Sequence, residues 1–312
     1  MNGIIILDKP EGFTSFDAVA VARRLFGQKK IGHTGTLDPM ATGVLPLLLG
    51  RATRAEALLP DTEKEYRAAF ALGTRTDTGD RTGQAIGQTD ARISREALAA
   101  VLPRFRGDIL QIPPMYSAIK KDGKRLYELA RKGIEVEREA RPITIARLEL
   151  LSFDEERQAG ELLVSCSKGT YIRALIEDLA AAAGTLGTMT ALRRTRACGF
   201  SLADAVPLDE ARRLAETDDL SALVRPVEGL FSVYPAVTVS AAQAARFANG
   251  GALDAARTSL RGKALPDGER LRVLGPDMHF LGLAETAGGE LRVLRLFCGP
   301  APADPGRKET QA

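Results

Sequence analysis

The chain has 312 residues, enough for one large domain, or for a large and a small one, around a sizeable buried core. Its net charge of +3 is small, so a nucleic-acid binder of this composition would need its basic residues gathered on one face. The three cysteines are widely separated and only two histidines are present, which argues against a disulfide framework and excludes a histidine-rich metal centre. No stretch has the length of a signal peptide core or of a membrane span, and we expect a cytoplasmic protein.

The first elements are a strand and a helix. Ile4 to Leu7 predicts a short buried strand, and the composition of the next five residues predicts a turn. Thr14 followed three residues later by Asp17 is typical of a helix cap, and Gly27 is a typical stop. A helix is therefore predicted between them.

The stretch from Gly32 to Leu45, GHTGTLDPMATGVL, predicts an irregular loop because it is rich in glycine and threonine. Pro39 disfavours helical backbone angles at Asp38, so the backbone restricts the direction of this one carboxylate. The apolar run Val44 to Leu49 predicts a buried strand. The glycine spacings of triphosphate-binding and dinucleotide-binding loops are absent. On composition alone, such a loop is more often a structural turn than a catalytic one.

This fourteen-residue string resembles the catalytic motif of the TruB-type tRNA pseudouridine synthases, in which the aspartate, Asp38 here, is the nucleophile. The segment from Asp8 to Ser15, DKPEGFTS, resembles a second family segment that packs beside the catalytic loop. The resemblance also implies a role for His33, which is suited to fill the space left by a flipped uridine.

The next two segments extend the resemblance. Lys64-Glu65-Tyr66 opens an alternating strand that runs to Leu72, and in the family the tyrosine at this position stacks on the target base. That role is carried to Tyr66. The polar loop from Thr74 to Gly83 also fits the family. Its Asp80 either orders the site by hydrogen bonding or braces its own turn.

The middle of the chain is its most basic part. A capped helix is predicted from Ser94 to Phe105, and basic residues then gather over about 112–142, with acids interleaved among them. One interpretation is a solvated helix with flanking loops. The other is a mobile insertion that closes on an RNA backbone, since lysine and arginine contacts to phosphates provide affinity without reading sequence. The family has an insertion here, whose structured part would be a helix from Leu126 to Lys132.

Two strands, Ile143 to Phe153 and Leu162 to Lys168, lead into the string KGTYIR, where we expect a helix capped by Thr170. In isolation, Arg173 would usually be a surface cation. The string resembles the third family motif, whose arginine pairs with the catalytic aspartate and whose tyrosine lines the uridine pocket. The resemblance assigns these roles to Arg173 and Tyr171, and a fixed guanidinium would favour the charged carboxylate.

The last strand of this region runs from Leu186 to Arg196. Its Leu192 matches a family position that contacts the nucleoside, and its three arginines are candidates for phosphate contacts or for a salt-bridged surface: Arg193, Arg194 and Arg196. A helix from Leu208 to Leu214 and a linker from Pro226 to Pro235 follow. Beyond them, one helix and three short strands resemble the PUA-like RNA-binding domain of bacterial TruB proteins.

Together these features predict an α+β fold. A catalytic domain over 1–232 would have a mixed, mainly antiparallel sheet with flanking helices, followed by a small C-terminal PUA-like β domain over 233–300 and a disordered tail over 301–312. The implied enzyme is a tRNA pseudouridine(55) synthase that flips uridine 55 of the T-loop, needs no cofactor or metal, and binds the T-stem-loop as a monomer. We expect no membrane association and no obligate protein partner.

Two other functions fit the same residues. One is a pseudouridine synthase that acts on another RNA or within a guide-RNA particle. The other is a non-catalytic RNA-binding or folding-assistance protein that opens the elbow of tRNA; it would need the basic surfaces but not Asp38.

Overall fold

The computed structural model describes residues 1–299 except 122, 218, 263 and 264. The tail expected over 301–312 lies outside the described residues. Ten strands of the described chain, all within its first 207 residues, form one large sheet: β1 (Gly3–Lys9), β2 (Ile31–His33), β3 (Thr42–Leu49), β4 (Lys64–Leu72), β7 (Gly107–Gln111), β10 (Arg141–Asp154), β11 (Ala159–Cys166), β12 (Gly187–Ala197), β13 (Phe200–Ser201) and β14 (Val206–Pro207).

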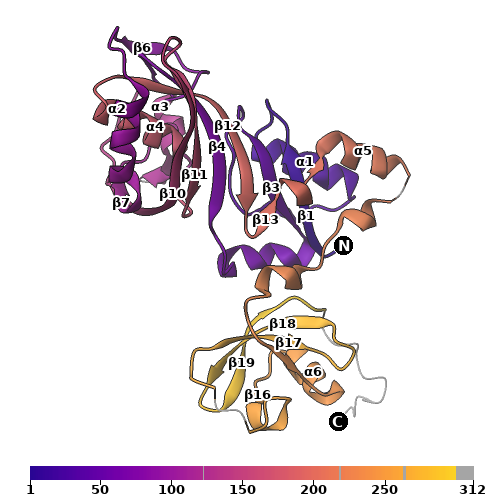
Figure 1. The fold of residues 1–312 in the computed structure, drawn as a ribbon. Helices are drawn as coiled ribbons and strands as arrows, with labels where there is room; N and C mark the ends of the chain where they lie inside the picture. The colour runs from indigo at the N-terminus through magenta and orange to yellow at the C-terminus, as the bar shows by residue number, and fades with distance from the viewer. Residues whose placement is uncertain (122, 218, 263–264, 300–312) are drawn as a thin grey trace.

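The strand order of this sheet is β14-β1-β3-β12-β4-β11-β10-β7, with β13 beside β12 and β2 beside β3 (Figure 1). Only the β1–β14 and β3–β12 pairs are parallel, so the sheet is mixed and mainly antiparallel, as the sequence predicts. Two small hairpins lie outside it: β5 (Thr74–Thr76) with β6 (Ala85–Gln88), and β8 (Lys120–Lys121) with β9 (Lys124–Arg125).

Five α-helices accompany the large sheet among the described residues: α1 (Ser15–Leu25), α2 (Arg95–Val101), α3 (Leu126–Ala130), α4 (Ile172–Ala182) and α5 (Leu208–Glu216). Short 3-10 helices add η1 (Gly50–Leu58), η2 (Leu102–Phe105), η3 (Leu202–Asp204), η4 (Leu220–Leu223) and η5 (Val227–Phe231). No helix of the described chain combines the length and apolar character needed to cross a membrane.

The predicted start and stop of the first helix are confirmed. Thr14 accepts from the backbone N–H of Asp17 at 3.0 Å, the Asp17 carboxylate accepts from the N–H of Thr14 at 2.9 Å, and Gly27 takes a φ of 59°. One expectation fails nearby: His33 belongs to β2 and not to an irregular loop, because residues 31–33 pair with Leu47 to Leu49. The residues after β3 form the 3-10 helix η1.

Strands β1 and β3 are buried on both faces. Ile5, Leu7 and Leu45 face a core formed with helices α1 and α4, whereas Ile4 and Ile6 face the opposite side. Successive side chains of a strand point to opposite faces, so two covered faces require the near-continuous apolar runs that the sequence shows here. The strand that follows the catalytic loop is thus anchored from both sides.

A second, five-stranded sheet forms the C-terminal unit. Its order is β15-β17-β18-β19-β16. The elements are β15 (Ala236–Thr238), α6 (Ala241–Ala248), β16 (Leu253–Asp254), η6 (Ala255–Arg257), β17 (Arg270–Leu274), β18 (Phe280–Ala287) and β19 (Glu290–Leu296). A glycine turn joins the last two strands, with positive φ at Gly288 and Gly289.

The segment that joins the two sheets is anchored by two buried side chains. Within it, η5 places Leu230 and Phe231 in an apolar cluster with Ile4 and Ile6 of β1. The ring of Phe231 lies 5.5 Å from that of Phe297, centroid to centroid. The C-terminal unit, drawn in orange and yellow in Figure 1, therefore lies at one end of the large sheet and shares this apolar cluster with the side of β1 and β3 that faces away from α1 and α4.

Replacement of Phe231 tests this shared core. Phe231 has no exposed surface, so we expect Phe231→Ala to lower the free energy of unfolding by about 3–5 kcal/mol, measured by denaturant unfolding. The control is Val233→Ala, because Val233 is 70% exposed and its loss should change the value by no more than about 0.5 kcal/mol. Equal effects of the two changes would show that the cluster does not join the sheets.

Candidate active site

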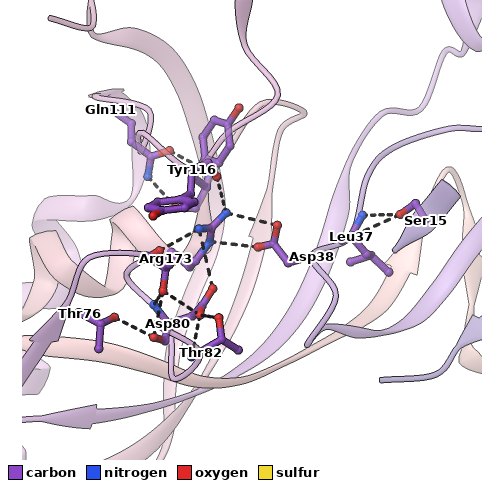
Figure 2. A network of polar contacts seen from close by, with 11 residues as sticks. Ser15, Leu37, Asp38, Thr76, Asp80, Thr82, Gln111, Tyr116 and Arg173 are labelled. Atoms are coloured by element: carbon purple, nitrogen blue, oxygen red, sulfur yellow. Dashed lines mark hydrogen bonds and ion pairs between the residues drawn. The ribbon is translucent and has the colours of Figure 1, made fainter. Parts of the chain in front are cut away.

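The loop that carries Asp38 is tied to its neighbours through its backbone. The hydroxyl of Ser15, at the start of α1, accepts from the N–H of Leu37 at 2.8 Å and donates to its carbonyl at 3.3 Å (Figure 2). The N–H of Ala41 donates to the carbonyl of Asp38 at 3.0 Å, which closes a turn after the carboxylate. The residues on both sides of Asp38 are therefore fixed.

Lys9 contacts the same loop and is fully buried. Its ammonium group donates to three backbone carbonyls, those of Pro10, Phe13 and Pro39. Burial lowers the pKa of Lys9 to about 8, although the negative charge of Asp38 opposes that change. Lys9 links the early turn to Pro39, so the segment from Asp8 to Ser15 packs against the Asp38 loop.

Asp38 and Arg173 form a bidentate ion pair. Nε of Arg173 lies 3.0 Å from Oδ2 of Asp38, and Nη2 lies 3.3 Å from Oδ1 (Figure 2). The side chain of Arg173 is 6% exposed, whereas that of Asp38 is 33% exposed. The pair thus presents its carboxylate to solvent and keeps its guanidinium covered.

The other donors of Arg173 hold two further segments. Nη1 donates to the carbonyl of Thr78 at 2.8 Å, and Nη2 donates to the carbonyl of Tyr116 at 2.9 Å. Asp80 lies close by, with Oδ2 at 3.8 Å from Nη1. One guanidinium therefore joins the Asp38 loop, the loop after β5 and the start of the 112–142 segment.

Among the described residues, the hydrogen bonds of the Asp80 side chain brace its own turn, and only an ion pair connects it to the site. Its Oδ1 accepts from the hydroxyls of Thr78 and Thr82 at 3.0 and 2.6 Å and from the N–H of Thr82 at 3.0 Å, which braces the turn. Its other oxygen faces Arg173, so the same buried carboxylate helps to order the Asp38–Arg173 pair.

Two opposing influences set the charge state of Asp38. Burial raises the pKa of the Asp38 carboxyl above its ordinary value, and the negative charge of Asp80 acts in the same direction. The guanidinium of Arg173 and, more weakly, the ammonium of Lys9 lower it. The ion pair limits how far the pKa of this carboxylate rises.

Tyr66 and Leu192 lie on adjacent strands of the same sheet. Tyr66 is on β4, and Leu192 on β12 is in register with Ala68, two residues further along β4. Both side chains are buried, and burial raises the pKa of Tyr66 to about 12, so its phenol is protonated at neutral pH. The charge of Asp38 acts in the same direction on the pKa of Tyr66, but burial is the largest cause.

Tyr171 precedes α4, and its backbone is held in a way that the sequence does not predict. The expected cap by Thr170 is wrong: Tyr171 itself is the cap residue and makes no side-chain cap bond. The amide of Gln111 holds the backbone of the cap residue itself, accepting from the N–H of Tyr171 at 2.8 Å and donating to its carbonyl at 3.1 Å. Burial raises the pKa of Tyr171, and the charges of Arg173 and Asp38 also act on it. Gln111 therefore fixes the backbone just before α4, two residues ahead of Arg173.

His33 is at the start of the loop, on β2. Its Nδ1 accepts from the N–H of Gly35 at 3.2 Å, so the neutral ring carries its proton on Nε2. Burial and the nearby charge of Arg194 lower the pKa of His33, which favours this neutral form. Within the described part of the chain, His33 makes no hydrogen bond to Asp38 or Arg173.

Sequence reasoning missed Lys9, Gln111 and the carbonyl of Tyr116. For Lys9 a signal existed: it follows Leu7 by two residues on one strand, so the period-two alternation places it on the core face. Gln111 and Tyr116 carry no comparable signal, because their partners come from segments more than fifty residues away.

Comparison with known proteins shows the family. Residues 23–172 match the N-terminal domain of the TruB family pseudouridylate synthases, 173–232 match the tRNA pseudouridylate synthase B C-terminal domain, and 235–297 match the C-terminal region of pseudouridine synthase II TruB. The chain belongs to the TruB family. It is therefore an isomerase, and the ion pair described above lies in a pseudouridine synthase fold.

Curated TruB relatives match nearly the whole chain. The tRNA pseudouridine synthase B of Azoarcus sp. (strain BH72) is 46% identical over 299 residues, 95% of each chain. That of Burkholderia mallei (strain NCTC 10247) is 44% identical over 296 residues, which cover 95% of this chain and 97% of the relative.

Solved structures with the same fold include Cbf5 assemblies. A Cbf5–Nop10–Gar1 complex matches with a TM-score of 0.71 and 24% identity, over 96% of this chain and 85% of the other. An H/ACA RNP bound to a substrate RNA containing 2′-deoxyuridine matches with a TM-score of 0.70 and 22% identity, over 96% and 86%. At this identity the likeness shows the TruB-type fold alone.

The geometry of the TruB ion pair predicts that Arg173 cannot be replaced by another cation. Arg173→Lys keeps the charge but loses the fork that bonds Asp38, Thr78 and Tyr116 together, so we expect turnover to fall by about 100-fold or more. Release of tritium from RNA labelled at uridine C5 measures turnover. A rate near that of the unaltered protein would contradict the role of the pair.

Asp80→Asn tests the electrostatics of the same pair. Removing the negative charge of Asp80 lowers the pKa of Asp38, and an attacking carboxylate must be deprotonated, so the acid limb of the pH–rate profile should move to lower pH. The rate on the plateau should fall by about tenfold, because an amide group replaces the carboxylate oxygen that faces the guanidinium of Arg173. A shift of the limb to higher pH would contradict this assignment.

Proposed function

We propose that this TruB-family protein converts uridine 55 in the T-loop of tRNA to pseudouridine, with Asp38 as the nucleophile. The observation that carries the proposal is the half-exposed Asp38 carboxylate, held by two contacts from a buried Arg173. Support for tRNA as the substrate comes from relatives named tRNA pseudouridine synthase B that are 44–46% identical over 95% of the chain.

The reaction is an isomerisation, so every atom of the uridine is retained. The bond from N1 of the uracil to the sugar breaks, the base turns, and a bond forms from C5 of the uracil to the same sugar carbon. C5 then loses its proton and N1 gains one. Asp38 can form a covalent bond to the nucleoside and leave again, because a carboxylate is both a nucleophile and a leaving group. Arg173 keeps that carboxylate ionised and oriented.

The other site residues would hold the uridine once it leaves the base stack. Flipping costs a few kcal/mol, which contacts to the extruded base must offset. Tyr66 stacks on the base and, because its phenol stays protonated, can relay a proton. Tyr171 and Leu192 complete the pocket, and His33 fills the space that the uridine vacates.

Two regions would bind the rest of the tRNA. The exposed lysines of β8 and β9, Lys120, Lys121 and Lys124, project from the 112–142 segment, which also contacts Arg173 through the Tyr116 carbonyl. They are suited to phosphate contacts. The C-terminal unit over 233–300 would bind tRNA outside the T-loop. We expect the protein to act as a monomer in the cytoplasm.

Asp38→Asn tests the proposed chemistry. The amide cannot act as the nucleophile, so we expect no pseudouridine in a synthetic T-stem-loop after incubation with the variant, while the Kd for that RNA changes by less than about threefold. Mass spectrometry of the modified base and fluorescence binding measure the two quantities. Asp90→Asn, at an exposed position, is the control and should leave both unchanged.

The result also separates the competing functions. Pseudouridine formed by the Asp38→Asn variant would refute the role of Asp38 as nucleophile. Refolding of denatured tRNA by the variant at the rate of the unaltered protein would support an additional folding role that does not need Asp38. A panel of other RNAs, each with a candidate uridine, would show whether the T-loop is the preferred substrate.

A further inference from the structure

Arg194 is the largest side chain in the described residues that is completely buried. It differs from its two neighbours: Arg193 pairs with Asp8 at 2.7 Å on a partly exposed surface, and Arg196 is exposed. The expectation that Arg194 contacts phosphate or forms a surface salt bridge is wrong. The alternation of β12 places it on the same buried face as Leu192, two residues earlier.

The guanidinium of Arg194 donates to three backbone carbonyls of the Asp38 loop and its flanking strand. Nε donates to the carbonyl of Val44 at 2.7 Å, Nη2 to that of Gly35 at 3.2 Å, and Nη1 to that of Thr36 at 3.4 Å. Gly35 and Thr36 precede Asp38, whereas Val44 follows it. A single side chain therefore fixes the backbone on both sides of Asp38.

Arg194 bonds to a part of β3 that, in the described chain, has no strand partner on the edge facing β12 and β2. Strand β12 pairs with β3 only at Thr42 and Gly43, and β2 pairs with it only from Leu47 onward. The carbonyl of Val44 lies between these two pairings, and Arg194 satisfies it. The backbones touch as well, because a Cβ on Gly43 would lie 2.2 Å from the carbonyl oxygen of Arg194, at a φ of +107°.

The charge of Arg194 is not neutralised by an acid. Among the residues that the structure describes, no carboxylate lies within salt-bridge distance of its guanidinium. Its charge instead lowers the pKa values of two other cations, Lys9 and Lys64. An apolar side chain could fill this space without the desolvation penalty of a buried charge. The planar fork of donors, which reaches three carbonyls at once, is what arginine alone provides.

We propose that Arg194 is a positioning residue that acts as a clamp: it bonds the backbone on both sides of Asp38 and so keeps the Asp38 carboxylate in place against Arg173. This rests on the proposed role of Asp38 as nucleophile. Because Arg194 is fully covered, it acts on the loop and not on the RNA.

The test compares Arg194→Lys and Arg194→Met with Arg67→Lys, a control on neighbouring β4 whose exposed guanidinium pairs with Glu161. We expect the single-turnover rate on a T-stem-loop to fall by about 30-fold for the lysine variant and by more for the methionine variant, with Kd changed by less than about threefold. Amide hydrogen exchange over residues 34–44 of the free protein should become at least about tenfold faster in both.

A purely structural role makes a different prediction. It requires the fall in rate to follow the loss of denaturant stability, which Arg194→Met lowers because the carbonyls of Gly35, Thr36 and Val44 lose their donor, whereas a clamp predicts that the faster exchange is confined to residues 34–44 and that the rate falls in variants that remain folded. Unchanged exchange over 34–44 in folded variants would overturn the proposal, as would a weaker Kd with an unchanged rate. The exchange measurement needs no RNA, so it tests the clamp even if the unaltered protein makes no pseudouridine.

Discussion

The ion pair between Asp38 and Arg173 is the interaction on which the site depends. A guanidinium has a fixed planar set of donors, and here they are directed to Asp38, Thr78 and Tyr116, which belong to three segments distant in sequence. Such convergence requires each segment to be held independently. The large sheet provides that support, because β3 fixes the Asp38 loop and α4, packed on the sheet, carries Arg173.

Strand β3 connects the site to the C-terminal unit. Its residues face the helix-side core on one surface and the cluster around Phe231 on the other. Removal of the C-terminal unit would expose apolar side chains directly behind the Asp38 loop, so a truncated protein would lose stability as well as any tRNA contact. Point changes on the surface of the unit are therefore the cleaner way to measure its contribution to RNA affinity.

The parts of the site that could be predicted from the sequence are those with local signals. Asp38 is marked by its loop and by Pro39, Arg173 by its motif, and the first helix by its Thr14 cap. The Gln111 amide on Tyr171 could not be predicted, because a side chain that bonds the backbone of a residue sixty positions away leaves no local pattern. Arg194 is intermediate: strand alternation predicts its burial, but only the tertiary structure shows that its partners are carbonyls.

The surroundings of Asp38 balance two requirements of a carboxylate nucleophile. A carboxylate with a raised pKa is more basic and so more nucleophilic once ionised, yet a pKa raised too far would leave it protonated and inert. Burial and Asp80 act in the first direction, while Arg173 and Lys9 act against it. Because Asp80 also faces Arg173, moving either residue changes both the orientation and the ionisation of Asp38. Geometry and charge at this site are therefore set by the same few contacts.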